Sequence, residues 1–232
     1  MKKPILYLSL ATLFFSLLLA TTFQTNSAAA TKQSNVDNPN KVIEKSVVTS
    51  PKNVNPLLIG ASIPDITLKT IENKDISLLD LAKNKPTIFI FYRGGWCPYC
   101  NLQLSQLRLI EAQLVELGYQ LVAISPDKVE KLQETSAKNN LNYLLLSDSS
   151  ANAAISFGIA FQVDSPTVES YKQYGVDLEK FAGEKHHILP VPSVFIVDTT
   201  GKIKFQYVNP DYKTRLSSDV ILAAAKSVII TK

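Results

Sequence analysis

Residues 91–100 read Phe91-Tyr92-Arg93-Gly94-Gly95-Trp96-Cys97-Pro98-Tyr99-Cys100. They follow the apolar, partly β-branched run Thr87-Ile88-Phe89-Ile90, which is typical of a buried strand, and they precede a helical pattern. We therefore expect a strand to end here, two glycines to turn the backbone, and a helix to begin with a thiol in its first turn. Unpaired amides and the positive end of the helix dipole stabilise an anion at that position.

Cys97 and Cys100 are the only cysteines in the chain. A cysteine at a helix N-terminus, with a second cysteine three residues on, has a pKa lowered from about 8.5 toward roughly 3.5–7.5. A thiolate beside a second thiol can be oxidised and then close a disulfide with it. The pair therefore predicts redox chemistry.

Two other interpretations of the pair fit the sequence less well. A structural disulfide that closes so small a ring removes little entropy from the unfolded chain. A zinc site needs two further ligands, and the only histidines, His186 and His187, are adjacent rather than spaced. A redox-active dithiol is the favoured interpretation, and we expect neither a metal nor a cofactor.

The first 30 residues have the pattern of a signal peptide. Lys2 and Lys3 form a basic region, the run from Ile5 to Ala20 is almost wholly apolar, and Ala28-Ala29-Ala30 offers a small-residue cleavage site. The apolar run is also close to the length of a short membrane span, so an uncleaved anchor that faces outward is the alternative. Export predicts a periplasmic or other extracytoplasmic location, where disulfides persist.

Composition divides the rest of the chain into a spacer and one domain. Residues 31–56 are rich in Asn, Lys, Ser, Thr and Pro without a sustained period, and we expect them to be disordered. Residues 57–232 are enough for one domain with a sizeable core. The formal net charge is +4, and removal of the two lysines near the start leaves +2. The scattered lysines do not predict a nucleic-acid partner, and a membrane contact is expected only through an uncleaved N-terminal segment.

Within residues 57–232, strand and helix patterns alternate. Strands are expected at 66–68, 75–77, 87–92, 121–125, 143–146, 193–198 and 202–208, and helices at 98–117, 129–138, 152–157 and 217–230. Residues 160–190 are expected to form an irregular insertion with one helix near 168–174. This order predicts an α/β fold in which helices cover both faces of a central sheet.

Several segments carry a family resemblance. Trp96-Cys97-Pro98-Tyr99-Cys100 resembles the thioredoxin active site, and the longer segment from Arg93 to Gln103 resembles the peroxiredoxin-like branch of the alkyl hydroperoxide reductase/thiol-specific antioxidant family. The likeness continues through residues 60–68, 189–198 and 209–212, and so covers nearly everything from about residue 57 to the end. It implies a thioredoxin-like fold with a central mixed β-sheet.

The active-site segment departs from the family pattern. Peroxiredoxins typically carry Pro-x-x-x-Thr-x-x-Cys, and in that register Arg93 replaces the proline, Cys97 replaces the threonine and Cys100 matches the cysteine. In the thioredoxin register Cys97 attacks and Cys100 resolves. The position of Cys97 at the helix entrance favours the second register, and we expect Cys97 to be the accessible thiol of low pKa.

The resemblance and the position of three further residues suggest supporting roles. A guanidinium at Arg93 would stabilise a thiolate or a peroxide oxygen, or else be a solvated side chain at a loop start. Trp96 is expected to cover the dithiol and to contact protein partners. Pro192 matches the proline that faces the cysteines in thioredoxin-like proteins. His186 and His187 are expected at the surface, and the sequence offers no mechanism for Tyr212 or Arg215.

These features predict a thiol-dependent peroxidase. The resemblance implies that Cys97 and Cys100 reduce a hydroperoxide, form a redox disulfide and are recycled by a thioredoxin-like protein reductant. The alternative is an exported thiol–disulfide oxidoreductase that acts on protein disulfides. An interaction or sensor module that uses the dithiol only as a switch also stays open, because fold does not decide function.

Overall fold

The computed structural model describes residues 47–230. In chain order the elements are η1 (Pro51–Asn53), β1 (Thr67–Thr70), β2 (Asp75–Ser77), α1 (Leu78–Asn84), β3 (Thr87–Phe91), α2 (Pro98–Glu116), β4 (Gln120–Ser125), α3 (Val129–Asn139), β5 (Leu144–Ser147), α4 (Asn152–Ser156), β6 (Ala160–Gln162), α5 (Ser165–Gln173), α6 (Leu178–Ala182), β7 (Ile188–Pro190), β8 (Ser193–Val197), β9 (Ile203–Val208) and α7 (Ser218–Ile230).

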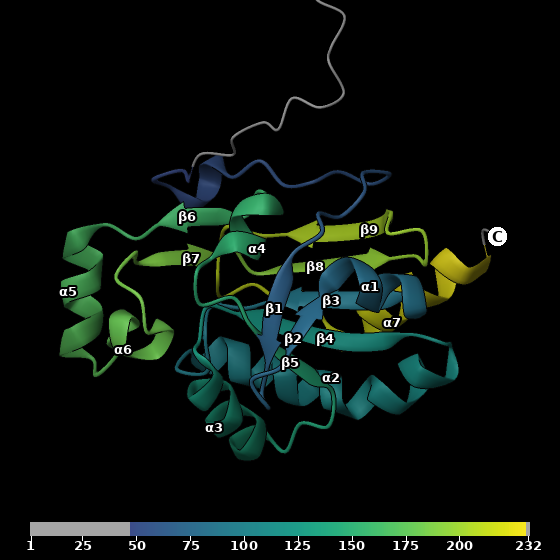
Figure 1. Ribbon diagram of the computed structural model, residues 1–232, viewed down its shortest axis with the longest axis horizontal. Coiled ribbons are helices and arrows are strands. Elements are labelled where there is room, and N and C mark those ends of the chain that lie inside the picture. The colour runs from purple at the N-terminus through teal and green to yellow at the C-terminus, as the bar shows by residue number, and fades with distance from the viewer. Residues whose placement is uncertain (1–46, 231–232) are drawn as a thin grey trace, which may run out of the picture. The chain divides into compact units, whose positions relative to one another are not determined.

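The central sheet has seven strands in the order β2-β1-β5-β4-β3-β8-β9 (Figure 1). Strands β3, β4 and β5 run parallel, whereas β1, β8 and β9 join by antiparallel pairing, so the sheet is mixed. The register places Phe91, the last residue of β3, opposite Ser193, the first residue of β8. The residue after Phe91 and the residue before Ser193 therefore meet at the same end of the sheet, where the dithiol follows.

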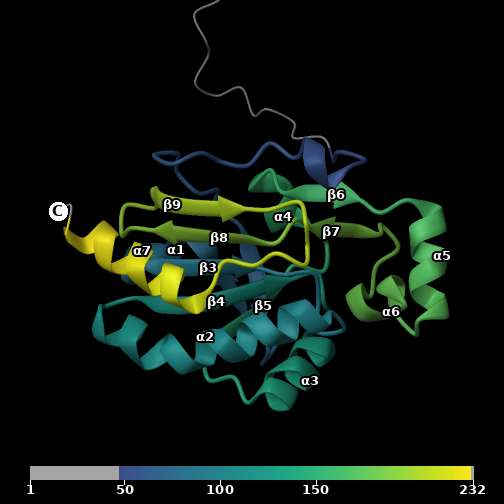
Figure 2. The same cartoon turned by 180° about the vertical axis from the view of Figure 1, so that it is seen from behind.

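Helices cover both faces of this sheet, as the alternation of strands and helices predicts. All five residues of β3 are buried, and their side chains alternate between the two faces. Ile88 and Ile90 pack in a core with α2, α3 and α7, whereas Phe89 and Phe91 pack in a second core with α1 and α4. Figure 2, turned to the back of Figure 1, brings α2 and α7 to the front. The expected thioredoxin-like α/β architecture is confirmed.

The insertion at residues 160–190 is more regular than the sequence predicts. It contains two helices, α5 and α6, rather than one, and β6 pairs with β7 in a separate two-stranded sheet. The helix α1 is also an addition to the predicted elements. These segments are short and carry no long apolar pattern that would predict them from the sequence. The helix α6 begins at the N-cap residue Asp177, whose side chain accepts a hydrogen bond from the Lys180 N–H.

Residues 47–56 differ from the predicted disordered spacer, because they pack on the domain. Val48 forms a parallel bridge with Phe161, and its carbonyl accepts the Gln162 N–H at 2.8 Å. The Leu57 N–H donates to the Phe157 carbonyl at 3.0 Å. The folded domain therefore begins about ten residues before the expected boundary at residue 57. The proposed signal peptide, the anchor alternative and most of the spacer lie outside the described residues.

We predict that deletion of residues 1–46 leaves the stability of the domain unchanged, whereas deletion of residues 1–56 lowers it. The longer deletion removes the Val48 bridge and the apolar contact of Val54, which together are worth about 1–2 kcal/mol. Thermal melting followed by circular dichroism should show a Tm lower by roughly 2–8 °C in the longer deletion alone. Identical melting curves would show that this segment adds nothing to the fold.

Candidate active site

The dithiol lies where β3 passes into α2, as the sequence predicts. Cys97 has extended backbone angles and is the N-cap residue of α2, and Pro98 occupies the first turn of that helix. The Cys97 carbonyl accepts the N–H groups of Cys100 and Asn101, both at 3.1 Å. The first turn of the helix thus carries both sulfur atoms.

The turn before the dithiol requires its two glycines. Gly94 has a φ of 145°, which side chains disfavour, and a Cβ there would collide with the Trp96 ring and come within 2.8 Å of Asp127 Oδ1. A Cβ on Gly95 would collide with the Thr135 hydroxyl on α3. The backbone can therefore approach α3 and the β4–α3 connection closely only if both residues lack side chains.

Both thiols are free and buried. The exposed fraction is 1% for Cys97 and 0% for Cys100. The expectation that Cys97 is accessible is therefore wrong for this closed arrangement. The reason is tertiary, because the segment between β9 and α7, residues 209–217, brings Arg215 against the sulfur atoms.

Arg215 is the contact that the sequence did not assign. Its Nη2 donates to Cys100 Sγ at 3.2 Å and lies 3.9 Å from Cys97 Sγ. Its Nε and Nη1 atoms are buried without a partner, and among residues 47–230 it forms no ion pair with a carboxylate. The positive charge of this guanidinium is therefore directed to the dithiol.

The two thiols differ in acidity. The pKa of Cys97 is lowered to about 6, first by a hydrogen bond from the Cys100 thiol, and further by the Cys100 amide and the cations Arg93 and Arg215. Burial raises the pKa of Cys100 well above its ordinary value. At neutral pH the site therefore holds a thiolate at Cys97 beside a protonated thiol at Cys100.

Arg93 is buried among aromatic rings rather than solvated. Its guanidinium carbon lies 4.8 Å from the centre of the Trp96 ring, 5.5 Å from that of Tyr171 and 4.1 Å from that of Tyr212, and its Nη2 donates to the Tyr171 hydroxyl. The rings hold the cation in place by cation–π attraction. The Arg93 guanidinium acts on Cys97 through its charge. The Arg93 backbone is hydrogen-bonded to the Cys100 sulfur and lowers the pKa of that thiol, although burial outweighs this effect.

Pro192 and Trp96 are each in contact with the surroundings of Arg93. Pro192 is buried, and its carbonyl accepts the Asn209 N–H at 3.3 Å. It lines a cavity of about 220 Å³ together with Arg93, Tyr171 and Tyr212, and the cysteines do not line it. Trp96 is half-buried and packs on Tyr171 at 5.6 Å between ring centres. Arg93 and Trp96 are therefore in contact with each other beside the dithiol, and Pro192 shares a cavity with Arg93, whereas a direct contact of Pro192 with the sulfur atoms stays a prediction.

His186 and His187 are structural rather than free surface residues. His186 Nδ1 accepts the Ile188 N–H at 2.8 Å, and its Nε2 contacts the Ser149 carbonyl at 2.6 Å. His187 Nε2 lies 2.9 Å from Glu179 on α6. His186 therefore joins the insertion to the segment after β5, whereas His187 joins two parts of the insertion. Within the described part of the chain, no three His, Cys, Asp or Glu side chains form a metal-binding group.

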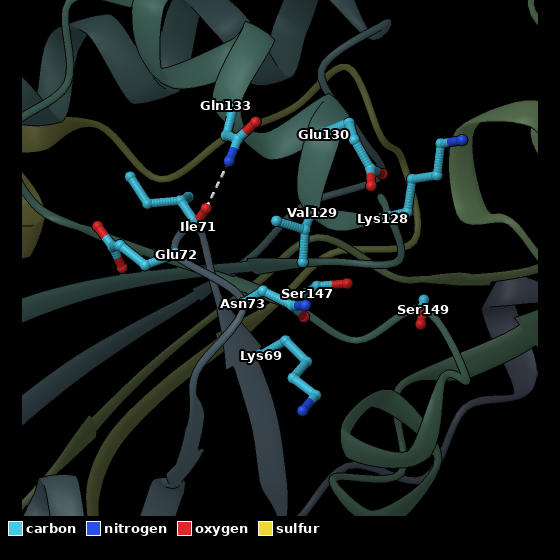
Figure 3. A pocket seen from close by; sticks show the side chains of 10 residues that line it. All are labelled: Lys69, Ile71, Glu72, Asn73, Lys128, Val129, Glu130, Gln133, Ser147 and Ser149. Carbon is cyan, nitrogen blue, oxygen red and sulfur yellow. Dashed lines mark hydrogen bonds between the residues drawn. The ribbon is translucent and has the colours of Figure 1, made fainter.

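A second hollow lies apart from the dithiol. Figure 3 shows it between the β1–β2 turn and the start of α3, where Gln133 donates to the Ile71 carbonyl at 2.6 Å. Its volume is about 530 Å³, and its lining includes Lys69, Lys128 and Glu130. It contains none of the site residues expected from the sequence.

Two buried carboxyl groups predict the pH dependence of stability. Burial raises the pKa of Asp127 and of Asp148 to about 7, from 3.8. The folded state therefore holds more protons than the unfolded state between about pH 4 and 7, so the free energy of unfolding falls as pH rises through this window.

Above about pH 6 the lowered pKa of Cys97 acts in the opposite direction, so the fall is clearest between pH 4 and 6. Urea unfolding of the reduced protein at several pH values measures it. The double variant Asp127→Asn/Asp148→Asn should show no such fall, and an unchanged pH slope in that variant would contradict the assignment.

The chain resembles known proteins along most of the described domain. Residues 59–206 match the family model described as the AhpC/TSA family. Peroxiredoxin Bcp of Escherichia coli (strain K12) is 30% identical over 170 residues, which cover 73% of this chain and 96% of that protein. A putative peroxiredoxin bcp of Haemophilus influenzae is 37% identical over 106 residues, covering 46% of this chain and 68% of that protein.

Solved structures show the same fold. The peroxidoxin BcpB of Mycobacterium tuberculosis superposes with a TM-score of 0.57 at 21% identity and covers 73% of this chain and 96% of its own. A cysteine-to-serine mutant of PrxQ of Xylella fastidiosa superposes with a TM-score of 0.58 at 17% identity and covers 75% of this chain and 98% of its own. The matched family segment ends before Arg215, so that residue comes from outside it. With its dithiol placed between β3 and α2 of this sheet, the chain belongs to the AhpC/TSA family.

Proposed function

We propose that this protein is a thiol-dependent peroxidase that reduces hydroperoxides through Cys97 and Cys100. The observation that carries the proposal is the dithiol at the start of α2, where Arg215 contacts both sulfur atoms and the pKa of Cys97 is lowered to about 6. A thiolate of low pKa beside a cation is the arrangement that attacks a peroxide oxygen. Membership of the AhpC/TSA family and the peroxiredoxin relatives support the same reaction.

In the proposed cycle the Cys97 thiolate attacks one oxygen of the hydroperoxide. The S–O bond forms as the O–O bond breaks, which leaves a sulfenic acid on Cys97 and an alkoxide that takes up a proton. Arg215 and Arg93 stabilise the negative charge during this step. The Cys100 sulfur then attacks the sulfenic sulfur and loses its proton, and the disulfide forms as water leaves.

Because both sulfur atoms are buried, the site must open before a peroxide can oxidise the dithiol, and again before a reductant can reach the disulfide. The 209–217 segment is held by the Asn209 bond to Pro192, by the Arg215 contacts and by packing of Tyr212 on Tyr99, whose ring centres are 5.9 Å apart. Tyr212 also contacts the Arg93 guanidinium, and Leu216 packs on the core. Displacement of the segment would break these contacts and open a route for a substrate. Oxidation neutralises the thiolate that Arg215 contacts, which would favour opening of the disulfide form to a protein reductant.

A thioredoxin-like protein is the proposed reductant. Its thiolate would attack one sulfur of the Cys97–Cys100 disulfide, form a mixed disulfide and be released by its own second thiol. The half-buried Trp96 next to the dithiol offers an aromatic contact for such a partner. The surface used by the partner would include the 209–217 segment in its open position.

Export of the protein is part of the proposal and rests on the N-terminal sequence. Residues 1–30 combine a basic start, an apolar run and an Ala28-Ala29-Ala30 site. No helix among residues 47–230 is long and apolar enough to cross a membrane. Cell fractionation and N-terminal sequencing of the mature protein test this, and a mature protein that begins at Met1 in the cytosol would refute cleavage and export.

Peroxide turnover tests the activity. The purified domain, a peroxide and a reduced thioredoxin-like protein should consume peroxide, and the double variant Cys97→Ser/Cys100→Ser should not. The same assay with a disulfide-bonded protein in place of peroxide measures the alternative exchange activity. Peroxide consumption equal to that of the double variant, with fast exchange on the protein disulfide, would refute the proposal in favour of the alternative.

A further inference from the structure

Asp127 is a buried carboxylate next to the dithiol turn. It follows β4, its exposed fraction is 1%, and its Oδ2 accepts the Gly95 N–H at 2.7 Å. Its Oδ1 is buried and has no partner of good hydrogen-bond geometry among the described residues. The Ser125 hydroxyl also lies near this carboxyl group and lowers its pKa. A buried carboxylate oxygen is costly unless it is hydrogen-bonded, so this atom calls for a donor that lies close by.

A small cavity lies beside this carboxylate. Its volume is about 10 Å³, close to the least space that one water molecule needs. Arg93, Trp96 and Asp127 line it together with apolar side chains of the insertion, among them Leu178 and Leu189. The Nε atom of Arg93 is also buried without a partner. One residue of the lining thus offers an unused acceptor and another an unused donor, which are the partners that a buried water requires.

We infer that Asp127 is a positioning residue of the dithiol site, which holds the Gly94–Gly95 turn directly and holds Arg93 through one water molecule in this cavity. The tests of this inference that measure a reaction rate with peroxide rest on the proposed function. The fluorescence and crystallographic tests do not depend on it. It adds a role for the β4–α3 connection, which contributes no residue to the chemistry itself.

The charge of Asp127 couples this arrangement to the dithiol. The groups around it are Tyr92 and Arg93 from the β3 end, Ser125 from β4, Lys131 and Glu134 from α3, and the apolar Leu178 and Phe181 from α6. Burial raises the pKa of Asp127 to about 7, so both of its forms are populated near neutral pH. Asp127 thus places a titratable charge at the cavity that Arg93 also lines, and Arg93 is one of the cations that lower the pKa of Cys97.

The single tryptophan of the chain gives a direct readout, because Trp96 lines the same cavity. The Cys97→Ser/Cys100→Ser variant removes the titration of the thiols. In that variant we expect Trp96 fluorescence to change with a midpoint near pH 7. The change should disappear on adding Asp127→Asn and persist on adding Asp148→Asn, since Asp148 is equally buried but binds the amides of Ala153 and Ala154 instead.

Reaction rates separate positioning from charge. Asp127→Asn keeps an acceptor for the Gly95 N–H, whereas Asp127→Ala removes it. We expect Asp127→Ala to slow oxidation of the dithiol by peroxide about tenfold, because misplacement of reacting groups is costly, and Asp127→Asn to restore most of the rate. Asp127→Asn should also lower the apparent pKa of Cys97, because a negative charge near the dithiol turn disfavours the thiolate.

A crystal structure of the reduced protein at high resolution completes the test. It should place one water between Asp127 Oδ1 and Arg93 Nε. The inference is overturned if the cavity is dry, or if Trp96 titrates equally in the Asp127→Asn variant. It is also overturned if Asp127→Ala reacts at the wild-type rate. If all variants, the wild type included, fail to react with peroxide, the proposed function fails while the fluorescence and crystal results still decide the inference.

Discussion

Replacing Arg215 with alanine is expected to slow the reaction of the reduced protein with peroxide about 100-fold. The guanidinium Nη2 lies 3.2 Å from Cys100 Sγ and 3.9 Å from Cys97 Sγ. Among the described residues it forms no salt bridge, although its charge also acts on the Asp211 carboxylate in the same segment. Removal of one fixed donor of this kind typically costs a factor of about 10²–10³ in rate. The pKa of Cys97 should rise in the same variant, because Arg215 is one of the cations that lower it.

Stopped-flow measurement of dithiol oxidation at several pH values checks both effects. Arg215→Lys should recover part of the rate, since it keeps the charge but not the geometry of the guanidinium. Arg108→Ala is a matched control. Arg108 is a partly buried arginine on α2, the helix that carries the dithiol, and it lies eight residues beyond Cys100. Equal losses in the Arg215 and Arg108 variants would point to general destabilisation instead of a role at the dithiol.

The second large effect concerns which sulfur attacks. At pH 7 a thiol with a pKa of about 6 is about 90% ionised, whereas one with a pKa above 9.0 is less than about 1% ionised. In Cys100→Ser the serine hydroxyl can replace the thiol as the donor to the Cys97 sulfur, and both arginines remain. This variant should therefore be alkylated faster than Cys97→Ser, by roughly 10–100-fold. Both thiols are buried under the same 209–217 segment, so the cost of opening it largely cancels in this comparison.

A sulfenic-acid probe gives an independent answer. After one equivalent of peroxide, Cys100→Ser should carry the label on Cys97, and Cys97→Ser should remain unlabelled. Each variant should also lose the internal disulfide, which mass measurement of the oxidised protein can verify. Rapid labelling of Cys100 in the Cys97→Ser variant would place the attack on Cys100, in the peroxiredoxin register.

Local sequence determined the centre of this protein. The apolar run at residues 87–91 predicts β3, the two glycines predict the turn, and the position of Cys97 at the start of α2 predicts its lowered pKa. These features depend on backbone preferences and on the first turn of one helix, which involve neighbours in the chain. The order of the strands of the central sheet and of helices α2, α3, α4 and α7 was predictable for the same reason, whereas α1, β6, α6 and β7 were not predicted. The mixed sheet followed from the family resemblance.

Only the tertiary structure decided what surrounds the dithiol. Arg215 is 115 residues from Cys100, and no local pattern places a guanidinium against a sulfur across that separation. The same holds for Asp127 under the Gly95 amide and for Tyr171 against Arg93. The burial of both thiols follows from these contacts, since it is packing between distant segments, and not the helix itself, that excludes water from the site.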